Sequence, residues 1–111
     1  MMENVEAGSI RVVFITVPRG EAGKLARDLV EQRLAACVNI MPKIESYFWW
    51  DDAVQHDEEA LLICKTTDAK FRALMEYTRE AHPYDLPEII SFPLSDGLPE
   101  YLAWVRKETE E

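Results

Sequence analysis

Apolar residues in this chain follow two alternating spacings, and the order of these spacings constrains the fold more than any other feature. Residues 10–17 form a nearly continuous β-branched run, which is typical of a strand covered on both faces. Residues 20–35 then repeat apolar positions every three or four residues, as an amphipathic helix does. Strand character returns at 37–41, 44–50 and 60–64, which predicts a long hairpin.

The second half of the chain repeats the order of helix and strand. Asp68 follows the end of a strand and is expected to cap a helix, which Pro83 ends. Residues 89–94 form the last strand, and Pro99 begins a terminal helix. The order βαββαβ with an extra C-terminal helix predicts an α+β fold, in which a ferredoxin-like antiparallel sheet carries two helices on one face.

Two helices cover only one face of such a sheet, so the other face needs a second explanation. The hairpin carries four consecutive aromatic residues, which place large rings on both of its faces whatever the pleat: Tyr47, Phe48, Trp49 and Trp50. The terminal helix, with Trp104, is one candidate cover within the chain. We favour a second copy of the chain, because closed homo-oligomers commonly bury such surfaces. These four residues are therefore expected at an interface between subunits.

Charge and cysteine content exclude several classes of protein. The chain has 21 acidic and 12 basic residues, and its net charge of −9 disfavours nucleic acids and anionic membranes as partners. Cys37 and Cys64 form no C-x-x-C pair, which indicates a reducing, cytoplasmic environment. Residues 1–9 lack the cationic start of a secretory signal, and no apolar stretch reaches the ~20 residues of a membrane span. We expect a short N-terminal tail at 1–9 and one domain at 10–111.

Candidate catalytic groups form no recognised constellation. The loop 19–24 lacks the glycine spacing and the Ser or Thr of a phosphate-binding loop. Only His56 and His82 could act as bases, and neither has a suitable partner in the sequence. Arg19 and Asn39 occupy places broadly similar to the phosphate- and water-holding residues of acylphosphatases, so acyl-phosphate hydrolysis stays open as an alternative. We expect a binding or assembly protein rather than an enzyme.

The segment from His82 to Glu88 is the richest in polar groups, because two prolines stiffen a loop that presents His82, Tyr84 and Glu88. A plain connection between helix and strand is the alternative interpretation. The soft or borderline metal ligands of the chain, none at chelating spacing, are Cys37, Cys64, His56 and His82. A metal site would therefore have to be assembled by folding or between subunits. Alternatively, Cys37 is a small buried residue and His82 complements a helix dipole.

Three blocks of the sequence resemble the signature segments of CutA, the divalent-cation tolerance family. They are residues 26–40 (ARDLVEQRLAACVNI), 61–67 (LLICKTT) and 82–90 (HPYDLPEII). The resemblance extends over residues 12–106. It implies a ferredoxin-like subunit in a cytoplasmic homotrimer with intertwined hairpins, a role in tolerance of copper and other divalent cations, and no securely assigned reaction.

The resemblance also implies site residues. Cys37 and His82 are the candidate ligands for copper or another divalent cation. Four further residues are implied in a polar cleft near subunit contacts: Glu59, Lys65, Tyr84 and Glu88. PII-type signalling proteins share the trimeric architecture, which leaves the alternative that Lys65 binds a small anionic ligand in a cleft between subunits.

The chain departs from the family pattern at three positions. Ile15 and Ala81 stand where copper-binding members carry a cysteine and a second histidine, so part of the soft copper site is missing. Asp52 stands where glycine is common, so we expect a looser or differently shaped hairpin turn.

Overall fold

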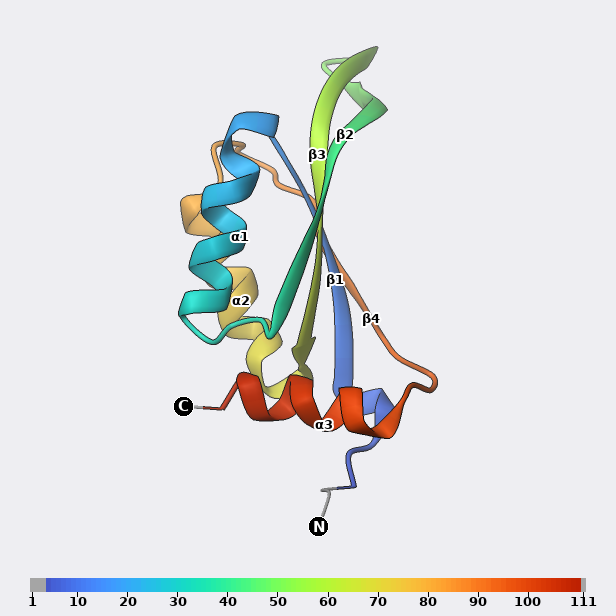
Figure 1. The fold of residues 1–111 in the computed structure, drawn as a ribbon. Coiled ribbons are helices and arrows are strands. Elements are labelled where there is room, and N and C mark those ends of the chain that lie inside the picture. The colour runs from blue at the N-terminus through green and yellow to red at the C-terminus, as the bar shows by residue number, and fades with distance from the viewer. Residues whose placement is uncertain (1–3, 111) are drawn as a thin grey trace.

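The structure is a computed structural model that describes residues 4–110 (Figure 1). Its α-helices are α1 (Ala22–Glu31), α2 (Asp68–Ala81) and α3 (Pro99–Glu108). Its strands are β1 (Ile10–Val17), β2 (Cys37–Trp50), β3 (Ala53–Thr67) and β4 (Ile89–Pro93). Short 3-10 turns at Ala7–Ser9 and Arg19–Glu21 precede β1 and α1. The predicted order, βαββαβ with an extra C-terminal helix, is confirmed.

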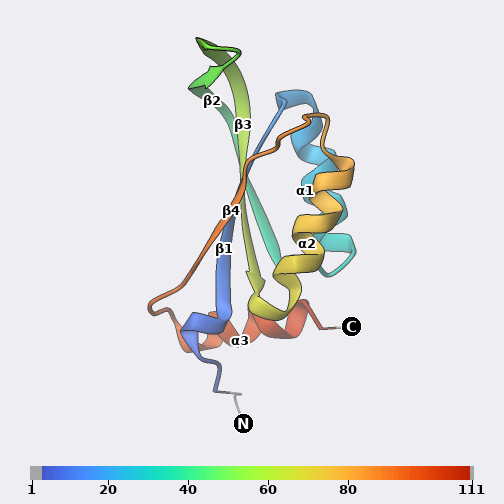
Figure 2. The same cartoon turned by 180° about the vertical axis from the view of Figure 1, so that it is seen from behind.

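The strands form one sheet in the order β2-β3-β1-β4, and each neighbouring pair is antiparallel. Figures 1 and 2 show α1 and α2 side by side on one face of this sheet. The side chains of β1 that point to the helices, Val13, Ile15 and Val17, are at most 1% exposed. They pack with Leu29 of α1 and Leu74 of α2 in the main core. The ferredoxin-like α+β prediction is confirmed.

The hairpin of β2 and β3 is longer than the apolar runs indicated, since β3 begins at Ala53 rather than near residue 60. Its two-residue turn joins the paired residues Trp50 and Ala53. Asp51 and Asp52 both adopt positive φ, 54° and 60°, as a tight type I′ turn requires. The expectation of a looser turn is therefore wrong, because aspartate tolerates the left-handed conformation better than most residues.

Two helix boundaries differ from the prediction. The first helix ends at Glu31 rather than at residue 35, because the chain turns at Arg33, whose φ is 62°. Thr67, not Asp68, caps α2, and its side chain accepts a hydrogen bond from the Lys70 amide at 3.3 Å. Asp68 instead pairs with Arg11 of β1. Among the described helices, none has the length and apolar character needed to cross a membrane.

Helix α3 lies across one end of the sheet rather than over its second face (Figures 1 and 2). It buries Leu102 and Val105 in a second cluster with Val5 and Ile10. The predicted tail at 1–9 thus contributes Val5 to this cluster, and residues 1–3 of that tail lie outside the described part. Trp104 stays 42% exposed, so the alternative in which α3 covers the aromatic surface is not supported.

The second face of the sheet is mostly apolar and carries no helix among residues 4–110. Strand register places its side chains together, and we call them the open face: Val12, Phe14, Met41, Leu61, Ile63, Ile90 and Phe92. Met41, Ile90 and Phe92 are 47%, 53% and 43% exposed. An apolar surface of this kind normally meets a partner.

Candidate functional site

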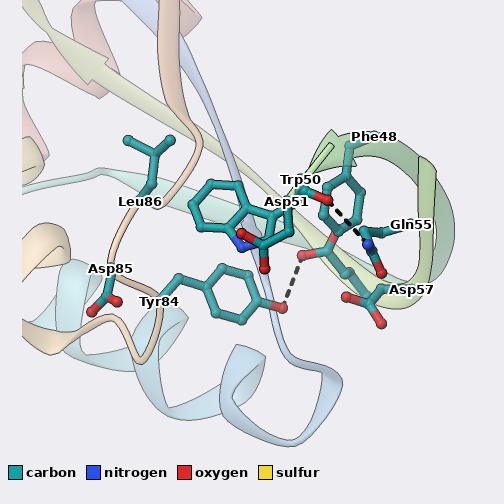
Figure 3. Close-up of a pocket in the computed structure, with 9 residues that line it drawn as sticks. Phe48, Trp50, Asp51, Gln55, Asp57, Tyr84, Asp85 and Leu86 are labelled. Carbon is teal, nitrogen blue, oxygen red and sulfur yellow. Dashed lines mark hydrogen bonds between the residues drawn. The ribbon is translucent and has the colours of Figure 1, made fainter. Parts of the chain in front are cut away.

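A hollow of about 340 Å³ lies where the hairpin meets the loop between α2 and β4 (Figure 3). Its walls come from both segments, and we call it the acidic hollow: Phe48, Trp50, Asp51, Gln55, Asp57, Glu59, Tyr84, Asp85 and Leu86. Four of these residues carry carboxylates and none carries a basic group. Concave sites of this size are typical of small-ligand binding.

One hydrogen bond of the acidic hollow joins the two segments. The Tyr84 hydroxyl donates a hydrogen bond to Glu59 Oε2 at 3.1 Å. Figure 3 marks this bond with a dashed line that starts at the Tyr84 hydroxyl. Glu59 is only 6% exposed, whereas Tyr84 is 36% exposed at the rim. Among the described residues, no basic side chain forms an ion pair with Glu59. A buried carboxylate whose partner is a neutral phenol is costly unless a cation reaches it.

Burial, together with the hydrogen bond and the negative charge of Glu59, raises the pKa of Tyr84 from 10.0 to about 12. The folded chain therefore holds the phenol proton more tightly than the unfolded chain does. The stability difference between wild type and Tyr84→Phe is expected to stay constant up to about pH 10 and to shrink between pH 10 and 12. Urea unfolding at several alkaline pH values measures this difference. A difference that grows over that interval would contradict the assignment.

His82 is buried, and both of its ring nitrogens are engaged. Nε2 lies 2.7 Å from the Thr16 carbonyl oxygen, and Nδ1 lies 3.1 Å from the Tyr84 amide nitrogen. An amide can only donate and a carbonyl can only accept, so the ring is the neutral tautomer with its proton on Nε2. His82 thus positions the loop that carries Tyr84. Neither nitrogen has a lone pair free for a metal ion in this arrangement.

Cys37 and Lys65 lie at the opposite end of the sheet from His82. Lys65 pairs across the strands with Cys37 and with Val12, whereas His82 contacts Thr16. Four residues along β1 separate the two ends by about 13 Å. One chain therefore does not bring the candidate metal ligands Cys37 and His82 together. The sequence offered no signal for this separation, because it depends on strand register.

The predicted ligand cleft is only partly assembled. Glu59 and Tyr84 meet in the acidic hollow, but Lys65 lies outside it and contacts Asn39 and the Cys37 sulfur, the latter at 4.0 Å. Glu88 is exposed beside β4 and does not line the hollow. Within one chain, Lys65 and Glu88 therefore do not line the acidic hollow. The cleft near subunit contacts that would include them stays a prediction.

Arg19 and Asn39, the pair behind the acylphosphatase alternative, do not share a site. Arg19 Nε donates to the Pro42 carbonyl at 2.9 Å, and its guanidinium lies 3.8 Å from Glu58. Asn39 contacts Lys65 instead. A phosphate-binding role for Arg19 would require breaking both of its contacts. Acyl-phosphate turnover that Arg19→Ala abolishes would restore this alternative.

Sequence reasoning did not select Asp51, Asp57 and Asp85 as site residues. The period of two along β3 places Asp57 on the same face as Glu59, and that signal was available in the sequence. Asp85 comes from a loop whose path the sequence does not specify. Of the four consecutive aromatic residues of the hairpin, which were predicted at an interface between subunits, Phe48 and Trp50 line the hollow. No three His, Cys, Asp or Glu side chains within residues 4–110 are arranged to hold a metal ion.

Comparison with known proteins places this chain in a family. The model of the CutA1 divalent ion tolerance protein family matches residues 11–108. The chain belongs to that family. A CutA1-family relative from Thermus thermophilus, "Divalent-cation tolerance protein CutA", is 48% identical over 99 residues, which are 88% of this chain and 96% of that protein. The resemblance drawn from the three sequence blocks is confirmed.

A plant relative and a solved structure from the CutA1 family are also similar to this chain. The rice "Protein CutA 1, chloroplastic" is 48% identical over 101 residues, which are 90% of this chain and 57% of the rice protein. The chain thus spans little more than half of that relative. The solved divalent cation tolerance protein from Thermus thermophilus superposes with a TM-score of 0.88 at 46% identity, covering 91% of this chain and 99% of that one. That CutA1 structure shares the fold described above.

Proposed function

We propose that this chain acts in divalent-cation tolerance by binding the cation at the acidic hollow of a homotrimeric, non-enzymatic protein. Family membership supports the tolerance role. The main support for the site is the environment of Glu59. This carboxylate is 6% exposed and has no basic partner among the described residues. Asp57 and Asp51 line the same hollow and add negative charge.

The donor set of the hollow favours hard cations. Carboxylate and phenol oxygens suit Mg²⁺, Ca²⁺ or Mn²⁺, whereas copper prefers thiolate and imidazole. One chain holds no complete cluster among residues 4–110, so water or a neighbouring subunit supplies the remaining ligands. The copper hypothesis through Cys37 and His82 then requires contacts between subunits and a rearranged His82.

Titration of metal-free protein with Mn²⁺ by calorimetry tests the proposed site. Glu59→Gln keeps the shape of the side chain and removes its charge, and we expect binding to weaken at least about tenfold, or ~1.4 kcal/mol. Glu88→Gln is the matched control, because Glu88 lies outside the hollow. No saturable Mn²⁺ binding, or equal weakening by both variants, would refute the hollow as the site.

Copper titration of the same protein tests the soft-ligand hypothesis. We expect Cys37→Ala to leave Mn²⁺ binding within about threefold of wild type, and we compare it with His82→Ala, which also removes a hydrogen bond that holds the loop of Tyr84. Copper binding that either substitution weakens, measured anaerobically for Cu(I), would instead support a thiolate and imidazole site between subunits.

The homotrimer proposal rests on two surfaces that one chain leaves uncovered. The open face of the sheet is apolar, and the hairpin exposes Tyr47 and Trp49 at 69% and 73%. Both edge strands, β2 and β4, have one side free for pairing within residues 4–110. A closed assembly of identical subunits covers such surfaces.

A second candidate function is suggested by Lys65. Its ammonium contacts Asn39 and Cys37 and makes no ion pair among the described residues. A PII-like trimer would use this charge to bind a small anion between subunits. Nucleotide binding that Lys65→Ala abolishes would favour this function over cation binding at the hollow.

We place the protein in the cytoplasm, because Cys37 and Cys64 are both free thiols and suit a reducing compartment. The rice relative is named chloroplastic, so compartment varies among members of the family. Cell fractionation with an antibody against the chain tests this placement.

A further inference from the structure

We propose that the acidic hollow also binds a linear aliphatic diammonium ion, the chemical class of the diamines and polyamines. This inference uses the hollow of the proposed function but does not depend on metal binding there. Three properties of the hollow support diamine binding: the sign of its charge, the nature of its walls and the Glu59 oxygen that accepts no hydrogen bond from the described residues.

The charge of the hollow selects a cation with more than one charge. Asp51, Asp57, Glu59 and Asp85 all line it, and no Lys, Arg or His does. Carboxylates that line a concave site concentrate field lines and attract cations more strongly than an open acidic surface does. A ligand with an ammonium group at each end can neutralise two separate carboxylates of this set.

The walls of the hollow favour an organic cation over a bare metal ion. Phe48, Trp50 and Tyr84 present aromatic rings, and Leu86 adds an aliphatic surface, as Figure 3 shows. Aromatic faces attract ammonium groups and recognise organic cations in known aromatic cages. The same walls offer contact area to a methylene chain, whereas a hydrated metal ion gains nothing from them.

Glu59 supplies the anchor. Its Oε2 accepts the hydrogen bond of Tyr84, but among residues 4–110 no hydrogen bond reaches Oε1. The residue is only 6% exposed and lines the hollow. An ammonium group carries three donors and can satisfy this oxygen with a charge-assisted hydrogen bond.

Calorimetric titration of the protein as it assembles in solution tests the proposal, with 1,5-diaminopentane as the probe. Pentylamine has one charge and 1,5-pentanediol has none, and both keep the chain length. We expect saturable binding of the diamine, binding at least about tenfold weaker for pentylamine and none for the diol. Equal binding of the three probes would show that charge is not recognised, and would overturn the proposal.

Two pairs of matched variants locate the diamine site. Trp50→Ala removes an aromatic wall and Glu59→Gln removes the anchor charge, and each is expected to weaken diamine binding at least about tenfold. Trp104→Ala and Glu88→Gln, outside the hollow, should leave binding unchanged. Tyr84→Ala gives a second wall variant in case Trp50→Ala alters assembly. Weakening by the controls to the same degree would overturn the site.

Mn²⁺ titration of the same variants separates this inference from the proposed function. Trp50→Ala should spare Mn²⁺ binding and weaken the diamine, whereas Glu59→Gln should weaken both. Mn²⁺ binding without diamine binding would overturn this inference alone, and diamine binding without Mn²⁺ binding would overturn the metal site alone. Absence of diamine binding refutes the proposal. The same holds if binding fails because a segment of a second copy fills the hollow.

Discussion

Replacing Leu62 with alanine is expected to lower the free energy of unfolding by about 2–5 kcal/mol, the range for deletion of a large aliphatic side chain from a packed core. Leu62 is 0% exposed in the middle of β3, where it lies between Ile15 of β1 and Ile40 of β2 in strand register. Its side chain belongs to the cluster that joins the sheet to α1 and α2. No neighbouring surface can collapse into the space without moving a strand or a helix.

Urea unfolding at a fixed protein concentration measures this loss, because the stability of an oligomer depends on concentration. Leu86→Ala is the matched control. Leu86 is 71% exposed at the rim of the acidic hollow, and we expect its substitution to change the free energy of unfolding by less than about 0.5 kcal/mol. Equal losses for the two variants would mean that the core is not centred on β3.

The order of the elements was predictable because each depends on local spacing. The β-branched run of β1 and the three- and four-residue spacing of α1 each specify one element without reference to the rest of the chain. Predicted helix boundaries were wrong where a contact with a residue far away in the sequence determines the boundary. Asp68 looks like a helix cap in the sequence, but it pairs with Arg11, 57 residues away, and Thr67 caps α2 instead.

The candidate site was only half predictable for the same reason. Glu59 and Tyr84 were selected through the family resemblance, and the structure joins them by a hydrogen bond. Lys65 belongs to the same set of signature positions, yet strand register places it beside Cys37 at the other end of the sheet. Register follows from the whole pattern of pairing, which a single sequence does not reveal residue by residue.

The hairpin shows why an aromatic run alone could not distinguish a ligand site from an interface. Successive side chains on a strand point to opposite faces, so the four rings divide into two pairs. Phe48 and Trp50 line the acidic hollow of their own chain. Tyr47 and Trp49 lie on the other face, where Tyr47 stacks on His56 at 4.4 Å between ring centroids and Trp49 pairs with Val54.

Replacing Trp49 with glutamate is expected to dissociate the proposed homotrimer. Trp49 is 73% exposed in the single chain, and its neighbour Val54 across the hairpin is 60% exposed. A buried tryptophan at the centre of an interface commonly contributes about 2 kcal/mol or more to binding, and its replacement by a charge adds the cost of desolvation. We therefore expect the dissociation constant of each subunit contact to rise at least about 30-fold.

Light scattering after size-exclusion chromatography at micromolar concentration measures the outcome. Wild type should give a mass of about 38 kDa, three times the 12.8 kDa of one chain, and Trp49→Glu should shift toward 12.8 kDa. Val30→Glu is the matched control: Val30 is 41% exposed on α1, on the opposite side of the sheet from the open face. A wild type that is monomeric at this concentration would refute the interface. If Trp49→Glu stayed trimeric, the open face of the sheet, rather than the hairpin, would have to hold the subunits together.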